Sequence, residues 1–153
     1  MRSQKRLLLE QLDRKLELFR PLLNISVPAQ GWIRTIRTTL NMTLVQLAEK
    51  LHLDYQSVQG FEAREAEGKI TLRNMKEVGA AMDMKFVYGF VPLEGSLEDL
   101  IDGKAQELAR KIVLKTHRNM MLEDQGTDDE RVQEAINELA GELKRSLNRS
   151  IWN

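Results

Sequence analysis

The chain has 153 residues, of which 42% are hydrophobic and 30% charged, which suits one domain or a small domain with helical extensions. It contains no cysteine, which excludes disulfides, thiolate metal sites and a cysteine nucleophile. Its 23 basic and 23 acidic residues cancel, so binding to nucleic acid would have to come from a local basic face.

The first predicted element is a helix over Ser3–Leu23, and with the connector after it this element makes up residues 1–29. Its apolar stripe has a 3-4-3-4 spacing and consists of Leu9, Leu12, Leu16, Phe19 and Leu23. The stripe either packs on the rest of the fold or forms a dimerisation seam, because this spacing also suits coiled-coil contacts. Pro28 and Gly31 indicate the connector.

Residues 30–92 are predicted to form a domain of four to five short helices with one β-strand after them, so the fold class is mainly α. Thr43 is expected to cap one helix, with Gln46 three residues later as in a capping box. Asp54 and Thr71 are expected to cap the next two helices.

The β-strand is predicted over Lys85–Val91, where the side chains alternate between two apolar faces. Phe86, Tyr88 and Phe90 share one of these faces. A strand needs partners for its backbone groups. The candidates are Ile25–Val27 and the same strand of a second copy.

Residues 93–153 are predicted to form a C-terminal helical region that is acidic, with nine basic and thirteen acidic residues. Ser96 is expected to cap its first helix, and Thr127–Glu130 to begin its last helix, with acids at the positive end of the helix dipole. Between them, the methionines of His117–Gln125 either fill the core or form a flexible docking surface.

The most informative segment is Thr43–Glu62, in which a tight turn is predicted to separate two short helices. Its apolar positions would face each other, and the small Ala48 suits the point where two helices cross steeply. The segment resembles the Cro-type helix-turn-helix of phage repressors and many antitoxins. The matching residues are Gln46, Leu47, Ala48, Val58, Phe61 and Glu62. His52 stands where those motifs usually have glycine, and we interpret it as a turn residue with positive φ.

The second helix of such a motif enters the DNA major groove. Tyr55, Gln56 and Gln59 are therefore the candidates for base contacts, since glutamine can bond an adenine edge through both its oxygen and its nitrogen. The alternative is that these residues are simply solvated. The candidates for phosphate contacts are Gln46, Arg34, Arg37, Arg64, Lys69 and Arg73. Glu62 is expected to pair internally with an arginine of the first domain helix.

A wider resemblance covers most of the chain. The runs GWIRTIRTTLNMTLVQLA, EAREAEGKITLRNMKEVGAAMDMKFVYGFVP and MMLEDQ together look like the family called mobile mystery protein A. Members of this family resemble antitoxin-type regulators and typically occur beside a Fic-domain protein. The resemblance implies a toxin–antitoxin-like or mobile-element module with a DNA-binding component.

Antitoxins that silence Fic enzymes often carry Ser/Thr-x-x-x-Glu followed by Gly or Asn. The chain has two Glu-Gly pairs, but Ala63 and Phe90 stand four residues before their glutamates. The inhibitory motif is therefore absent, and neutralisation of such a partner would need another route, such as masking by the acidic C-terminal helices.

We therefore predict a dimeric, sequence-specific DNA-binding regulator that is not an enzyme, with no cofactor, no metal and no catalytic residue. Autoregulation of a toxin–antitoxin-like operon with a Fic-domain partner is the role that the resemblance implies. The alternative is a protein-binding antitoxin or adaptor whose C-terminal helices dock a partner protein. The apolar runs are too short to span a membrane and the N-terminus lacks a signal-peptide pattern, so a cytoplasmic protein is expected.

Overall fold

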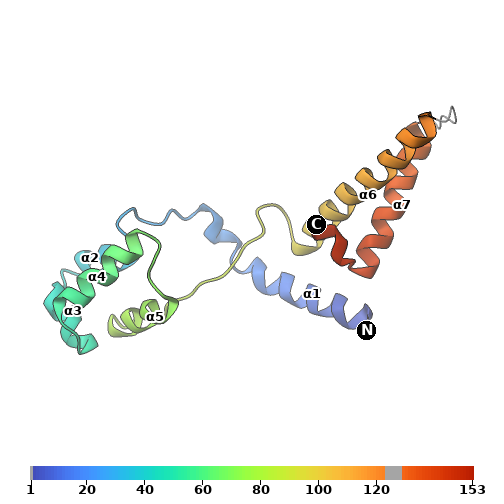
Figure 1. Ribbon diagram of the computed structural model, residues 1–153. Coiled ribbons are helices and arrows are strands. Elements are labelled where there is room, and N and C mark those ends of the chain that lie inside the picture. Colours follow the sequence, from blue (N-terminus) through green and yellow to red (C-terminus); the bar gives the residue numbers. More distant parts are fainter. Residues whose placement is uncertain (1, 123–128) are drawn as a thin grey trace. The chain divides into compact units, whose positions relative to one another are not determined.

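In the computed structural model, residues 2–122 and 129–153 are described (Figure 1). The chain divides into two compact units. One is the central segment Asn24–Gly89, and the other combines the described parts of Met1–Leu23 and Phe90–Asn153. None of the described helices is both long enough and apolar enough to cross a membrane.

The central unit consists of four short helices: α2 (Trp32–Thr39), α3 (Leu44–Leu51), α4 (Tyr55–Ala66) and α5 (Leu72–Ala81). The four expected helix caps are confirmed: in this unit Thr43, Asp54 and Thr71, and outside it Ser96. Each side chain accepts a hydrogen bond from a backbone N–H three residues later. The buried core of the unit consists of Ile33, Leu47, Ala48, Val58, Phe61, Val78 and Met82.

The prediction of a β-strand over Lys85–Val91 is wrong, because every regular element among the described residues is helical. After α5 the chain turns at Asp83, whose φ is 58°, and continues without pairing to Ile25–Val27. The alternating pattern instead places aromatic rings together: Phe86 stacks on Tyr88 with centroids 5.8 Å apart. Alternation indicates an extended segment, but a strand also needs a ladder of backbone hydrogen bonds.

The other unit is built on an antiparallel pair of helices, α6 (Leu97–Leu122) and α7 (Asp129–Ser146), with η2 (Arg149–Trp152) packed against α6. Its buried core consists of Ile101, Ala105, Ala109, Ile136, Ala140, Leu143 and Ile151. The alanines in this set have small side chains, which let the two helices approach closely. The expected starting residue Thr127 and the acidic end of His117–Gln125 lie outside the described residues.

The N-terminal helix α1 (Arg2–Glu17) is shorter than predicted and is followed by the short helix η1 (Arg20–Asn24). Pro21 lies in η1, and proline has no N–H with which to continue a regular α-helix. Asp13 joins α1 to α6, since its carboxylate accepts hydrogen bonds from the backbone N–H groups of Leu97 (2.7 Å) and Glu98 (3.2 Å).

Candidate nucleic-acid interface

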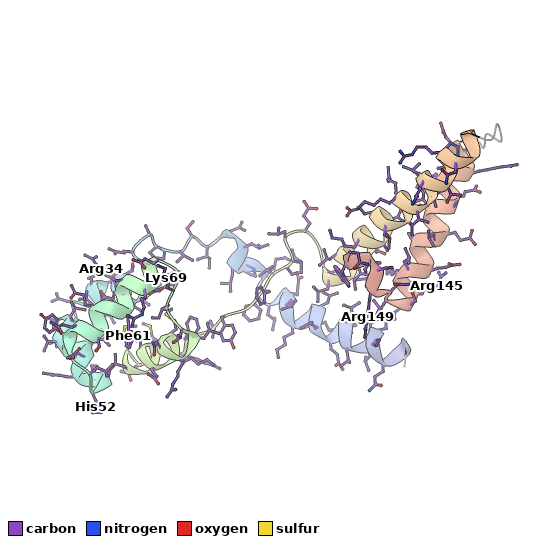
Figure 2. All side chains as sticks on the ribbon, viewed as in Figure 1. Arg34, His52, Phe61, Lys69, Arg145 and Arg149 are labelled. Carbon is purple, nitrogen blue, oxygen red and sulfur yellow. The ribbon has the colours of Figure 1, made fainter. Side chains whose placement is uncertain are left out.

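The turn between α3 and α4 is made by His52, which has φ 56° and ψ 39° and therefore lies in the left-handed region. Leu53 N–H then donates to the carbonyl of Ala48 at 2.9 Å, which closes the end of α3. Asp54 begins the next helix by accepting a hydrogen bond from Ser57 N–H at 2.7 Å. The interpretation of His52 as a turn residue is confirmed (Figure 2).

The crossing of α3 and α4 is held by apolar side chains that are almost completely buried. Leu47 and Val58 have no exposed surface, and Ala48 lies beside them with 3% exposed. Such a closely packed pair of helices fixes which face of α4 points outward, since the opposite face must stay in the core.

The outward face of α4 carries one aromatic side chain, two amides and one small side chain, all uncharged. Tyr55, Gln56, Gln59 and Ala63 are all exposed, and the structure thus brings the three candidates for base contacts together on one helix. No exposed acidic side chain occurs between Tyr55 and Arg64, because Glu62 is buried. From Tyr55 to Arg64 this face therefore carries no exposed carboxylate, although the exposed N-cap Asp54 stands directly before it.

Gly60 leaves room for the side chain of Arg64. A Cβ atom at position 60 would lie 3.1 Å from the Arg64 guanidinium, which extends back along α4. The guanidinium lies 5.2 Å from the centre of the Phe61 ring, within the range of a cation–π contact. Arg64 is thus held against α4 while it remains exposed to solvent.

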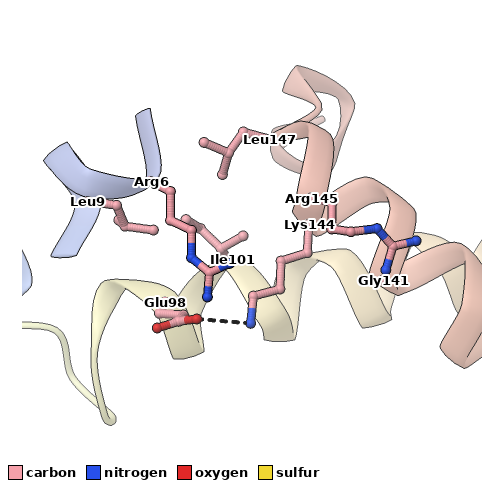
Figure 3. Close-up of a pocket in the computed structure, with 8 residues that line it drawn as sticks. All are labelled: Arg6, Leu9, Glu98, Ile101, Gly141, Lys144, Arg145 and Leu147. Atoms are coloured by element: carbon pink, nitrogen blue, oxygen red, sulfur yellow. Dashed lines mark ion pairs between the residues drawn. The ribbon is translucent and has the colours of Figure 1, made fainter. Parts of the chain in front are cut away.

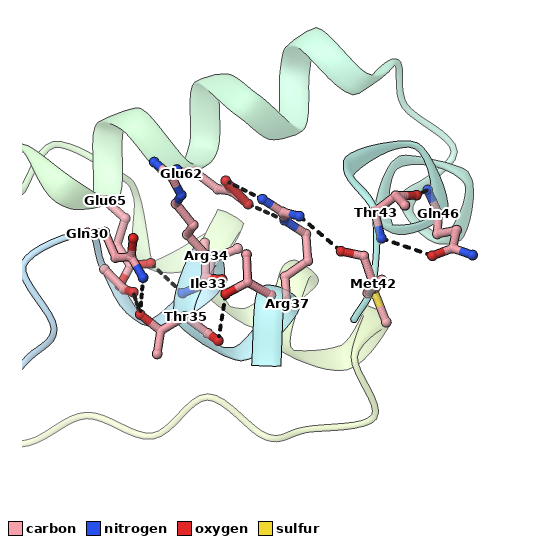
Figure 4. Close-up of polar contacts among 12 residues, drawn as sticks. Gln30, Ile33, Arg34, Thr35, Arg37, Met42, Thr43, Gln46, Glu62 and Glu65 are labelled. Atoms are coloured by element: carbon pink, nitrogen blue, oxygen red, sulfur yellow. Dashed lines mark hydrogen bonds and ion pairs between the residues drawn. The ribbon is translucent and has the colours of Figure 1, made fainter. Parts of the chain in front are cut away.

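Two glutamates on the inward side of α4 hold α2 (Figure 4). Glu62 accepts hydrogen bonds from the Arg37 guanidinium at 2.5 and 3.2 Å, and this confirms the expected internal pair. Glu65 caps the other end of α2 by accepting from the N–H groups of Trp32 (2.7 Å) and Ile33 (2.8 Å). A carboxylate at this position also suits the positive end of the helix dipole.

The capping role of Glu65 is not evident from the sequence, and Gly31 is the signal that could have indicated it. Gly31 is the N-cap of α2 with φ 87°, and it has no side chain to cap the helix. A Cβ atom there would lie 2.8 Å from the Glu65 carboxylate. Gly31 thus leaves the room that the Glu65 carboxylate needs at the start of α2.

The phosphate candidates differ in how free their side chains are. The Arg37 side chain is only 11% exposed and also donates to the Met42 carbonyl at 2.9 Å, so we leave it out of the interface. The side-chain oxygen of Gln46 accepts from Thr43 N–H at 2.9 Å, which leaves its exposed amide N–H groups free to donate. Arg34 is also exposed.

Two further candidates lie beyond the C-terminal end of α4. Lys69 and Arg73 are exposed and make surface ion pairs, with Glu67 and Glu77 respectively, at 3.3 Å each. Because α4 has 12 residues and is about 18 Å long, Lys69 is well separated from the base-contact candidates in its first turns.

A cavity of about 320 Å³ lies between α2 and α4 and opens at the outward face of α4. Arg34 and Gln59 both line it, and the Arg37–Glu62 pair forms part of its wall. The arrangement places a cationic side chain and an amide at one opening, where a phosphate and a base edge can be contacted together.

Comparison with known proteins does not assign the chain to a family. No family model matches the chain, and no match was found among curated proteins or solved structures. Among the described residues, no group of three or more His, Asp or Glu side chains is placed to hold a metal ion.

Proposed function

We propose that this protein is a sequence-specific DNA-binding transcriptional regulator that inserts α4 into the major groove. The observation that supports the proposal is the division of α4 into two faces. Its acidic residues Glu62 and Glu65 point inward to hold α2, while its exposed first turns carry amides and small side chains. The exposed side chains from Tyr55 to Ala63 can approach bases without a carboxylate among them, and Arg64 supplies positive charge beside them.

In this proposal Gln56 and Gln59 read base edges, Tyr55 contacts a thymine methyl or a phosphate, and Arg34, Gln46 and Arg64 position the domain on the backbone. Lys69 and Arg73 add positive charge farther along the surface. A single domain of this size makes few base contacts, so we propose a dimer on an inverted repeat, with two copies that read two half-sites.

The first test is binding of the full chain to labelled DNA from its own upstream region, against scrambled DNA of the same composition, over a salt series. We expect tighter binding to the upstream DNA and a linear fall of log affinity with log salt concentration. Equal and weak binding to both DNAs would contradict the proposal.

Two substitutions separate base contacts from phosphate contacts. Gln56→Ala should weaken binding to the upstream DNA about tenfold and leave binding to scrambled DNA unchanged. Arg64→Ala should weaken both and reduce the salt slope by about one. Gln106→Ala and Arg110→Ala are the matched controls, since both residues are exposed on α6, outside the central unit. Unchanged affinity in Gln56→Ala and Arg64→Ala would refute the assignment of α4 as the recognition helix.

The second candidate function is a protein-binding antitoxin or adaptor. It is favoured by a row of exposed glutamates at i,i+4 spacing on α7, namely Glu130, Glu134, Glu138 and Glu142. None of them makes an ion pair within the described part of the chain. Like charges at this spacing destabilise a helix, so binding of a basic partner surface would reduce the repulsion between these glutamates.

On the resemblance to mobile mystery protein A, the partner proposed for this second role is a Fic-domain protein, and the setting is a cytoplasmic, autoregulated toxin–antitoxin-like module. Co-purification with the product of the neighbouring gene tests it. Replacing Glu134 and Glu138 by glutamine should release the partner without changing DNA affinity. Retention of the partner by that variant would exclude α7 as the docking surface.

A further inference from the structure

A second cavity lies within the unit formed by the described parts of Met1–Leu23 and Phe90–Asn153. It has a volume of about 530 Å³ and opens between α1, α6 and α7 (Figure 3). Its wall is mainly apolar, with Leu9, Ile101 and Leu147 contributing side chains. Small-molecule sites in proteins typically have volumes of roughly 300–1,000 Å³ and walls of this kind.

The cavity exists because α1 is fastened to the rest of the unit mainly through its C-terminal half. Asp13 of α1 caps α6, and just after α1 the Arg20 guanidinium of η1 donates to the Gly95 carbonyl. In the N-terminal half, Leu9 packs against the core of the unit, whereas Leu7 and Leu8 are more than half exposed. The space beside Leu9 is therefore left open.

The charged side chains at the cavity are mostly cationic. Arg6, Lys144 and Arg145 line it, against one carboxylate, that of Glu98. Lys144 is already paired, at 3.2 Å with Glu98 and 3.0 Å with Asp102, and the hydrogen bond to Asp102 is the main cause that raises its pKa. Lys144 thus stays charged, and the Glu98 carboxylate already has Lys144 as its ion-pair partner.

Arg6 and Arg145 are the two cationic side chains at the cavity that can still bind a ligand carboxylate. The Arg6 side chain is 75% exposed, and its contact with Glu10 is long at 3.5 Å, a geometry that contributes little in water. Arg145 makes no ion pair within the described part of the chain. Figure 3 shows the Arg6 guanidinium extending from α1 toward Ile101 and Lys144.

We propose that this cavity binds a small amphipathic monocarboxylate, with its apolar tail against Leu9, Ile101 and Leu147 and its carboxylate on Arg6. The apolar wall selects the tail, and the guanidinium supplies the charge-assisted hydrogen bonds that a carboxylate accepts. Binding joins the loosely held half of α1 to α6 and α7 and stabilises the folded chain by mass action. None of the residues that line this cavity is among those proposed to contact DNA.

The test is calorimetric titration of the full chain with octanoate, below its micellar concentration, and with 1-octanol as the uncharged probe. We expect saturable one-to-one binding of octanoate and a concentration-dependent rise in melting temperature. Octanol should bind about tenfold more weakly, since it lacks the charge-assisted contact. Absence of saturable octanoate binding, or equal binding of octanol, would overturn the proposal.

Arg6→Ala is the diagnostic variant, and its exposed position means that the fold should be kept. It should weaken octanoate binding about tenfold and leave octanol binding unchanged. Arg14→Ala is the matched control, because Arg14 lies on the same helix but does not line the cavity. Equal octanoate affinity in Arg6→Ala and the unchanged chain would also overturn the proposal, whatever the outcome of the DNA experiments.

Discussion

Removing the carboxylate of Glu62 should destabilise the central unit strongly. The Arg37 and Glu62 side chains are 11% and 7% exposed, and two hydrogen bonds join them. In Glu62→Ala the guanidinium keeps only the Met42 carbonyl as a protein partner. Breaking a buried pair in this way typically costs about 3–5 kcal/mol, because one charge is left without its partner.

We expect the lower end of that range, about 3 kcal/mol, since some water reaches Arg37. For a domain of this size the corresponding fall in melting temperature is about 12–24 °C. The control is Glu77→Ala, which breaks the Arg73–Glu77 pair, whose side chains are 88% and 50% exposed. That loss should be about 0–1 kcal/mol.

The assay is urea unfolding followed by fluorescence in a Trp152→Phe background. The chain has two tryptophans, so Trp32 alone then reports on the central unit. The double change of Arg37 to methionine and Glu62 to leucine should recover much of the stability, because it removes both buried charges. If Glu62→Ala costs no more than Glu77→Ala, the reasoning about this pair is refuted.

Three further changes test the local geometry. His52→Gly should raise the free energy of unfolding by about 1 kcal/mol in urea titrations, because glycine adopts positive φ without strain, and a decrease would contradict the role given to the turn. Glu65→Ala should cost about 1–2 kcal/mol in the same assay, since the first two N–H groups of α2 lose their cap; the matched surface change Glu67→Ala should cost much less. Hydrogen bonds from Ser57, from its side chain first and its backbone second, lower the pKa of Asp54 below 3.8. The part of its stabilisation that depends on charge is therefore present above pH 3.8 and lost as pH falls through the lower folded value, so the stability difference between Asp54→Ala and the unchanged chain should shrink in acid; a difference that stays the same across this pH range would contradict this.

Local rules predicted the helix ends of the central unit well. Thr43, Asp54 and Thr71 act as caps because a cap depends on a side chain and a backbone group only three residues apart. The left-handed turn at His52 is likewise a local property, which the position in the motif indicated.

Features that depend on distant residues were harder to predict. The alternation in Lys85–Val91 is compatible with a strand, yet no described segment pairs with it. Arg37 was predicted as a phosphate contact because the expected pairing of Glu62 with an arginine of the first domain helix left open whether Arg34 or Arg37 is the partner. The structure shows that it is Arg37, twenty-five residues from Glu62. The cap from Glu65 also spans more than thirty residues, and only the bare N-cap at Gly31 indicates it.

The two faces of α4 make stability and proposed recognition separable by mutation. Glu62 is buried and Glu65 is half-buried against α2, whereas Gln56 and Gln59 are exposed. Changes on the inner face should therefore lower stability and reduce DNA affinity only where the unit begins to unfold. Changes on the outer face should leave the free energy of unfolding unchanged. If Gln56→Ala lowered stability as much as Glu65→Ala, the side chain would belong to the fold, and its proposed contact with a base would lose its support.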